Sequence, residues 1–212
     1  MAPVVTTPKK KRRTASRQVR KKQLIKATIK SIAKHGLSVT TMATVSQEAG
    51  LSQGIINLHF QSKERLLEET LRHVVDEYRY TWNKALEESG DSAAEKLVAL
   101  VGVDFDSKVC HPDKLAVWFA FWGESRSRPT YRKICAQRDR EYRLGLSGVC
   151  EDIISEGQYA IDADVAAFGI SAMNQGLWLD ILLNPTELDR TIAYEVSMSH
   201  LSLIFPRHFD LR

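Results

Sequence analysis

Apolar residues recur every three or four positions along most of the chain, which is the spacing of one face of an α-helix. The first such segment covers residues 16–35 and stops at a glycine. The later long segments are expected at residues 62–89, 92–109, 113–125, 129–156, 162–183 and 186–205. Glycine or proline positions, which end helices, separate most of them. No segment alternates convincingly with the period of two that marks a strand, so the predicted fold class is all-α.

Two much shorter helical segments lie within residues 40–63. Thr40 or Thr41 is placed to cap the first, and Gly50 allows the chain to turn tightly after it. Ser52 is placed to cap the second. Two short helices joined by a tight turn form a helix-turn-helix, whose second helix enters the major groove of DNA. The pattern therefore predicts a DNA-binding domain.

The stretch resembles the DNA-binding motif of the TetR family of bacterial repressors. The matching positions are Thr41, Ala49, Gly50, Leu51, Ser52, Gly54, His59, Phe60 and Lys63. The resemblance implies about nine helices, three in a small head and six in a larger body. We accordingly expect a helix-turn-helix DNA-binding domain at residues 16–61 and a helical effector-binding and dimerisation domain at residues 62–212.

Several side chains of the motif are candidates for contacting DNA. Glutamine and asparagine can pair with adenine through two hydrogen bonds, which suits Gln53 and Asn57 to reading bases. Ser52 is either a helix cap or a DNA contact. The family often has tyrosine where Asn57 stands, which would change the operator and leave the mechanism intact. The candidate DNA-binding residues are Thr41, Ser52, Gln53, Gly54, Asn57, His59 and Lys63.

Positive charge is concentrated at the N-terminus. Residues 1–22 carry a net charge of +9, whereas the whole chain carries +4, so the remainder is mildly acidic. Residues 1–15 should be a disordered basic arm. The arm is either a solvated tail or a segment that lies along DNA phosphates. The resemblance to bacterial repressors makes a nuclear-localisation signal at PKKKRR the weaker interpretation.

The predicted body contains all four tryptophans of the chain. Trp118 and Trp122 are four residues apart and therefore share one helix face. Any one of these rings is explained most simply as core. As a group with few acids, they suit a cage that holds a quaternary ammonium ion by the faces of its rings. The candidate effector-binding residues are Trp118, Phe121, Trp122, Tyr131, Asn174, Gln175 and Trp178.

The TetR resemblance extends into this body through the segments VWFAFW, TYR and GLWL, which are similar to those of choline-responsive members. It implies choline or a related cation as effector and a role in glycine-betaine metabolism. Those members tend to have an acid where Gln175 stands. Because Gln175 is neutral, the negative charge beside a choline-like cation would have to come from Glu124, Asp106 or Asp180. Otherwise the effector differs, for example betaine, carnitine or another cation.

The last two predicted helices are rich in apolar and small residues. This composition fits an intramolecular core, and the resemblance implies in addition that both helices build a homodimer interface. A two-fold dimer would match a palindromic operator in double-stranded DNA.

Other classes of protein find little support in the sequence. It has no glycine-rich phosphate loop, nucleophile elbow or metal-ligand cluster, so we expect no enzyme, no catalytic or metal site and no cofactor. Its three cysteines are far apart and suggest free thiols in a reducing cytosol. No apolar run is long enough to span a membrane, and we expect a cytoplasmic, nucleoid-associated bacterial protein. The alternatives are a TetR-type regulator of another pathway with a different effector, and an architectural DNA-binding dimer without one.

Overall fold

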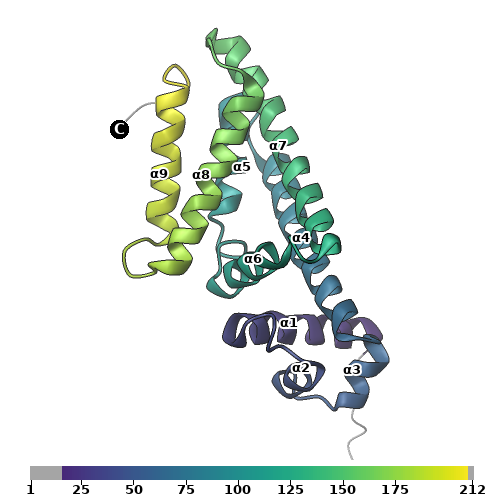
Figure 1. Cartoon of the computed structure of the whole chain (residues 1–212). Helices are drawn as coiled ribbons and strands as arrows, with labels where there is room; N and C mark the ends of the chain where they lie inside the picture. The colour runs from purple at the N-terminus through teal and green to yellow at the C-terminus, as the bar shows by residue number, and fades with distance from the viewer. Residues whose placement is uncertain (1–15, 210–212) are drawn as a thin grey trace, which may run out of the picture.

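The computed structural model describes residues 16–209, and within them the chain forms nine α-helices and no strand. Figure 1 shows a head of three helices at one end and a larger helical body at the other, with one long helix running from head to body. This arrangement confirms the predicted all-α fold class. The predicted disordered arm at residues 1–15 lies outside the described residues.

The head is built on local capping and a small core. Its helices are α1 (Arg17–His35), α2 (Met42–Glu48) and α3 (Gln53–His59). Thr41 caps α2 in a reciprocal pair of hydrogen bonds with Thr44. Gly50 then turns the chain with a φ of 62°, which a residue with a side chain rarely adopts. Ile56 and Phe60 are buried beneath α3, and this burial fixes which side of the helix faces outward.

The body contains six helices, and two of them meet the head. They are α4 (Lys63–Glu88), α5 (Ala93–Asp104), α6 (Pro112–Glu124), α7 (Pro129–Gly157), α8 (Ala163–Leu183) and α9 (Arg190–Ile204). The first turns of α4 pack against α1, where Lys21 and Glu69 form an ion pair of 2.9 Å. Helix α6 lies across the base of the body and also packs on α1 (Figure 1). Head and body are therefore joined by α4 and by the α1–α6 contact.

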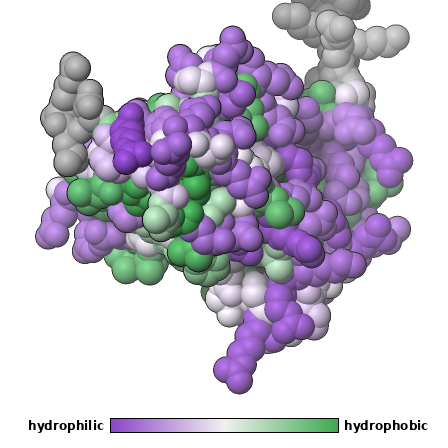
Figure 2. All heavy atoms as spheres, turned by 90° about the horizontal axis from the view of Figure 1, so that it is seen from above, coloured by the Kyte–Doolittle hydropathy of each residue, from purple (hydrophilic) through white to green (hydrophobic). Residues whose placement is uncertain are grey.

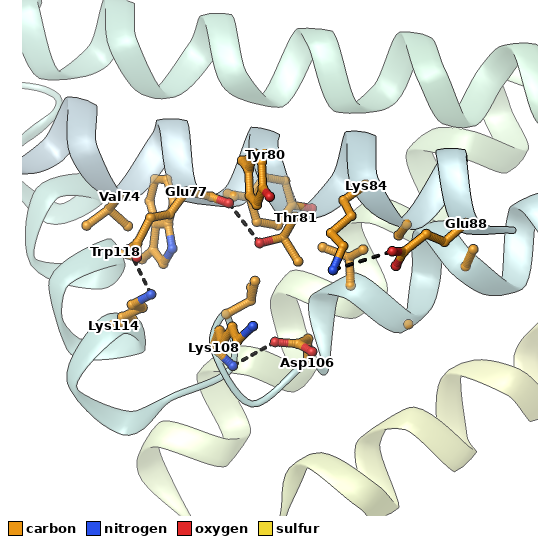
Figure 3. Close-up of a pocket in the computed structure, with 16 residues that line it drawn as sticks. Val74, Glu77, Tyr80, Thr81, Lys84, Glu88, Asp106, Lys108, Lys114 and Trp118 are labelled. Atoms are coloured by element: carbon orange, nitrogen blue, oxygen red, sulfur yellow. Dashed lines mark hydrogen bonds and ion pairs between the residues drawn. The ribbon is translucent and has the colours of Figure 1, made fainter.

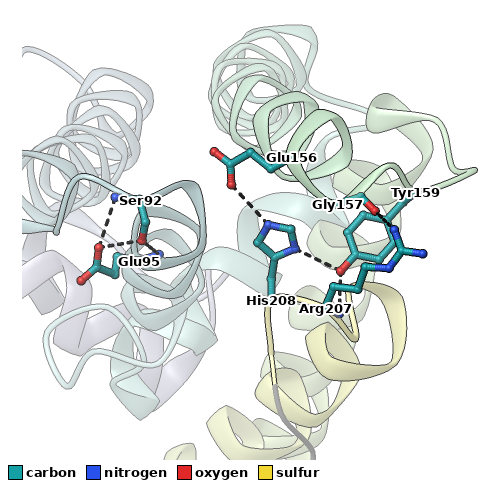
Figure 4. Close-up of polar contacts among 7 residues, drawn as sticks. All are labelled: Ser92, Glu95, Glu156, Gly157, Tyr159, Arg207 and His208. Carbon is teal, nitrogen blue, oxygen red and sulfur yellow. Dashed lines mark hydrogen bonds and ion pairs between the residues drawn. The ribbon is translucent and has the colours of Figure 1, made fainter.

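Polar contacts fix the ends of two body segments (Figure 4). Ser92 and Glu95 form a capping box at the start of α5. After α9 the chain folds back onto the end of α7, where the Tyr159 hydroxyl lies 3.0 Å from Nδ1 of His208. The same hydroxyl accepts a hydrogen bond of 2.7 Å from the backbone N–H of Arg207.

Helix α5 is shorter than the sequence predicts. Expected to reach residue 109, it ends at Asp104. The backbone carbonyl of Asp106 accepts a hydrogen bond of 2.7 Å from the N–H of Cys110, and its carboxylate accepts one of 2.7 Å from the N–H of Lys108. These bonds stabilise a turn, and an aspartate that bonds its own backbone in this way competes with helix continuation.

Two further details of the helix prediction are wrong. The last helix was expected to start at Thr186, but α9 starts at Arg190, because Asp189 caps it by accepting hydrogen bonds from two backbone N–H groups at 2.8 and 2.9 Å. An apolar side chain within the helix predicted at residues 129–156 is expected to face inward, but Leu144 is 61% exposed.

The exposed apolar side chains of the body gather on α8 and α9. Figure 2 shows hydrophobic atoms collected on the side of the molecule where these helices lie in Figure 1. We call this surface the α8–α9 face; its exposed members are Val165, Phe168, Leu179, Leu183, Ile192, Val196 and Leu203. Among the described residues, α8 is the one helix long and apolar enough to cross a membrane by length and composition alone. It packs against α7 and α9.

Candidate functional site

The candidate base-reading residues lie on the outer side of α3. Ser52, Gln53, Gly54 and Asn57 are exposed, whereas Ile56 between them is fully buried. Ser52 occupies the N-cap position of α3, but its hydroxyl makes no capping hydrogen bond. The cap interpretation of Ser52 therefore has no hydrogen bond to support it, and the DNA contact stays a prediction.

Three other candidate DNA contacts interact with neighbouring residues of the protein itself. Thr41 is exposed while it caps α2, and Nζ of Lys63 donates a hydrogen bond of 2.8 Å to the backbone carbonyl of Ser38. His59 is half-buried beside Phe60, with 6.4 Å between the ring centroids. Burial, together with positive charge on the N-terminal half of α1, lowers the pKa of His59. His59 is therefore neutral at pH 7, where its ring packs beside Phe60.

A buried carboxylate organises the interior of the body. Asp104, the last residue of α5, is 3% exposed. Its Oδ1 accepts a hydrogen bond of 2.7 Å from the Tyr78 hydroxyl of α4, and its Oδ2 accepts one of 2.7 Å from the Tyr142 hydroxyl of α7. Asn174 of α8 donates to the same Oδ2 at 2.8 Å, and the Trp178 indole N–H donates to the Asp104 carbonyl at 2.7 Å. Burial raises the pKa of Asp104, and the hydrogen bonds to its carboxylate oppose that rise.

Four aromatic rings surround a buried cation beside this carboxylate. The guanidinium carbon of Arg138 lies 4.1 Å from the ring centroid of Tyr78, 4.7 Å from Trp118, 5.4 Å from Trp178 and 6.0 Å from Tyr142. These separations are within the roughly 6 Å over which a cation is attracted to a ring face. We call the four rings the cage. Burial alone would lower the pKa of Arg138, but nearby acidic groups outweigh burial and raise it, so the caged group is a cation.

The structure brings some of the predicted effector residues to the cage. Trp118 and Trp178 belong to it, and Trp122 stacks on Trp178 with 6.5 Å between ring centroids and 16° between ring planes. Gln175 lines the same small space beside Arg138. Asn174 contributes indirectly, because its amide holds Asp104.

Phe121 and Tyr131 lie apart from the cage as an edge-to-face pair with 4.8 Å between ring centroids. Burial raises the pKa of Tyr131, and nearby charges, among them Glu64 at the start of α4, also affect it. This pair therefore lies toward the head, where α4, α6 and α7 come together.

Two charged residues at the centre of the site are not among those predicted from the sequence. The counter-charge was expected at Glu124, Asp106 or Asp180, but Asp180 is exposed and Glu124 bonds to Ser127 at the end of α6. The acid beside the rings is Asp104. Asp104 and Arg138 each continue the apolar stripe of their helix, since they lie three or four residues from buried positions. A charged residue on an otherwise apolar stripe is the signal that could have identified them.

An open cleft of about 430 Å³ lies beside the cage, between α4, α5 and α6 (Figure 3). Tyr78 and Trp118 line both the cleft and the cage, so the cleft reaches the cage rings from solvent. Charges around the cleft are balanced and partly paired, with Lys114 contacting Glu77 at 2.8 Å. Its charged members are Glu77, Lys84, Glu88, Asp106, Lys108 and Lys114.

The described residues contain no group of three or more metal-binding side chains placed to hold an ion. The three cysteines are buried and free. Burial raises the pKa of Cys110 and Cys135 to about 11 and that of Cys150 to about 12, so these thiols are protonated at neutral pH.

The chain matches known families in both of its parts. Residues 24–70 match the bacterial regulatory proteins of the tetR family, and residues 93–206 match the C-terminal domain of BetI-type transcriptional repressors. The HTH-type transcriptional regulator BetI of Burkholderia mallei is 34% identical over 90% of this chain and 96% of its own length. That of Paraburkholderia phytofirmans is 33% identical over 89% and 94%.

Solved structures agree in fold. A putative transcriptional regulator from Pseudomonas aeruginosa PAO1 superposes with a TM-score of 0.78 at 29% identity, covering 92% of this chain and 94% of that one. A putative regulator from Saccharomonospora viridis, solved in complex with choline, has a TM-score of 0.78 at 22% identity over 87% and 96%.

These relatives are transcriptional regulators, which confirms that the chain is not an enzyme. Regulators of this kind act in the cytoplasm, bind DNA and small-molecule effectors, and are typically dimers. Sequence, fold and both domain matches agree: the chain belongs to the TetR family of bacterial transcriptional regulators and carries a BetI-type C-terminal domain.

Proposed function

We propose that this repressor is controlled by choline or a closely related trimethylammonium compound and regulates genes of glycine-betaine metabolism. The observation that carries the proposal is the cage, four ring faces around one buried cation with the Asp104 carboxylate alongside. A quaternary ammonium ion has no N–H to donate, so its binding depends on ring faces and a nearby negative charge. The choline complex of the Saccharomonospora viridis regulator supports the same effector class.

A zwitterionic trimethylammonium compound, such as glycine betaine or carnitine, is the second candidate. The balanced charges around the cleft favour it, because the lysines there offer partners for a carboxylate.

The head would read DNA through α3. Gln53 and Asn57 are exposed and have side chains able to pair with adenine. Thr41 and Lys63 lie at the ends of neighbouring helices, where contacts to phosphates would set the orientation of the head. The basic arm at residues 1–15 would add sequence-independent affinity for DNA, and with it association with the nucleoid.

The body would dimerise through the α8–α9 face. Exposed apolar side chains grouped on two adjacent helices mark an interaction surface, and a two-fold axis through them would pair α8 and α9 with the same helices of a second copy. Burial in such an interface also accounts for the apolar length of α8. The dimer would place two heads on a palindromic operator.

The effector signal would pass to the head through the two connections between head and body. Trp118 lies on α6, which packs on α1, and Tyr78 lies on α4, which continues into the head. A shift of these helices that is worth roughly 1–3 kcal/mol changes operator affinity about 5- to 150-fold.

Gel-shift titrations with DNA from the region upstream of the gene and of its neighbours test the effector. Choline, glycine betaine and carnitine are compared with sodium chloride at equal ionic strength. We expect one of the three compounds to change operator affinity at least about fivefold. Trp178→Leu should abolish that response, whereas Leu144→Ala, at an exposed leucine of α7, should keep it. If none of the compounds acts, the proposed effector class is wrong.

The same assay tests the base-reading role. Asn57→Ala should weaken binding to the operator far more than binding to a scrambled duplex. Equal losses on both duplexes would contradict a role in reading bases.

A further inference from the structure

The cage is occupied in this structure by a side chain of the protein itself. We propose that the guanidinium of Arg138 is an internal competitor, which fills the effector's cage in the effector-free protein and which a quaternary ammonium ion displaces on binding. The inference rests on the proposed function in one respect, that the cage is the effector site.

Geometry places Arg138 where an ammonium ion would lie. Its side chain is 3% exposed and reaches inward from α7 to the ring faces of Tyr78, Trp118 and Trp178 at 4.1–5.4 Å. The space remaining beside it, lined also by Gln175, admits no further molecule. An external cation therefore has no room in the cage while Arg138 is there.

Arg138 is an imperfect occupant of this site. A guanidinium carries five N–H donors, yet the buried Nε of Arg138 has no hydrogen-bond partner. The Asp104 carboxylate already accepts from two tyrosines and from Asn174, and the ion pair of Arg138 is with Asp139, at 2.6 Å. A trimethylammonium group has no donor to leave unsatisfied, so it suits the ring faces better than the side chain it replaces.

The surroundings offer a way in for the effector and a way out for Arg138. The cleft of Figure 3 is open to solvent and shares Tyr78 and Trp118 with the cage. Asp139, already paired with Arg138, is 21% exposed, so a displaced guanidinium keeps its partner as it moves toward solvent.

Displacement of Arg138 would affect α4, the helix that enters the head. One turn beyond Arg138, Glu141 accepts two hydrogen bonds from Arg79 of α4, at 2.7 and 3.0 Å. A movement of α7 that lets Arg138 leave therefore acts on the α4–α7 contact. This links occupation of the cage to the position of the head.

Calorimetric titration of the full-length protein with choline and with tetramethylammonium chloride tests the proposal. Arg138→Met keeps most of the apolar stem and removes the charge. If Arg138 occupies the cage at least nine-tenths of the time, its removal tightens binding of both ions about tenfold or more, because apparent affinity is reduced by the fraction of protein that is competent to bind. Arg140→Met, at an exposed arginine of the same helix, should leave affinity unchanged.

A second variant supplies an independent measurement. Arg138→Ala leaves a hole of guanidinium shape, so millimolar methylguanidinium should raise its melting temperature and compete with tetramethylammonium. Wild type and Arg140→Met should show neither effect. If Arg138→Met does not fold, as judged by circular dichroism, Arg138→Gln replaces it in the titrations.

The outcomes separate this inference from the proposed function. Wild-type binding of choline with equal or weaker binding by the Arg138→Met variant overturns the competitor and leaves the effector assignment standing. Binding of tetramethylammonium by the variant alone supports the competitor and refutes choline as the effector. Binding of neither ion by either protein overturns both proposals. If methylguanidinium fails to bind the Arg138→Ala variant, only the internal competitor is overturned.

Discussion

Replacing Asp104 with alanine should destabilise the body more than almost any other single substitution. Asp104 accepts side-chain hydrogen bonds from Tyr78, Tyr142 and Asn174 and is 3% exposed. The alanine variant leaves these three buried donors without their acceptor, while Arg138 keeps its ion pair with Asp139.

The size of the effect follows from the number of donors. Each buried donor left unsatisfied costs about 1–3 kcal/mol. The separate effects do not add fully, and we expect a loss of roughly 4–6 kcal/mol from a total stability on the order of 5–15 kcal/mol. Tyr142→Phe removes one donor, and the loss should be about 1.5–3 kcal/mol, the usual contribution of a hydrogen bond to a charged group.

Urea unfolding followed by tryptophan fluorescence measures the free energy of unfolding, and protein concentration must be fixed because the stability of a dimer depends on it. Asp152→Ala, at an exposed acid of α7, is the control and should change stability by less than about 0.5 kcal/mol. A loss of under about 1 kcal/mol for Asp104→Ala would refute the reasoning, since that is the size of an ordinary surface effect.

Other predictions address the dimer, pH and the thiols. Phe168→Glu places a charge on the α8–α9 face and should convert dimer to monomer in light scattering, whereas Val39→Glu, at an exposed apolar residue of the head, should not. Burial lowers the pKa of His73 from 6.5, so its contribution to stability is present above pH 6.5 and is lost as pH falls through the folded pKa. The urea midpoint, measured from about pH 5 to about pH 8, should therefore depend less on pH in His73→Gln, and an unchanged slope would count against this. The three buried thiols should react with a disulfide reagent far more slowly in the native protein than in urea, and equal rates would contradict their protonation and burial.

The sequence predicted the helices well because their signals are local. Thr41, Ser62 and Ser92 cap helices, and their hydroxyls accept backbone N–H groups three residues on. The errors arose where a second local signal competed. Asp106 forms a turn inside the single helix predicted at residues 92–109, and Asp189, closer than Thr186 to the apolar stripe, starts the last helix.

The site was only partly predictable because its residues come from different helices. Trp118 and Trp178 were suspected from composition, but nothing local shows that Tyr78 of α4 and Tyr142 of α7 bond to one carboxylate of α5. The assembly depends on how α4, α5, α7 and α8 pack together, and local patterns in one sequence do not show which helices will meet. What a sequence does reveal is Arg138 on a buried stripe, and a charge there requires a partner.

The most direct test of the account is a crystal structure of the protein grown with choline. We predict that the quaternary nitrogen lies within about 6 Å of the ring centroids of Trp118 and Trp178, and that the Arg138 side chain has left the cage. Choline bound at another place, with Arg138 still between the rings, would contradict both the effector site and the displacement.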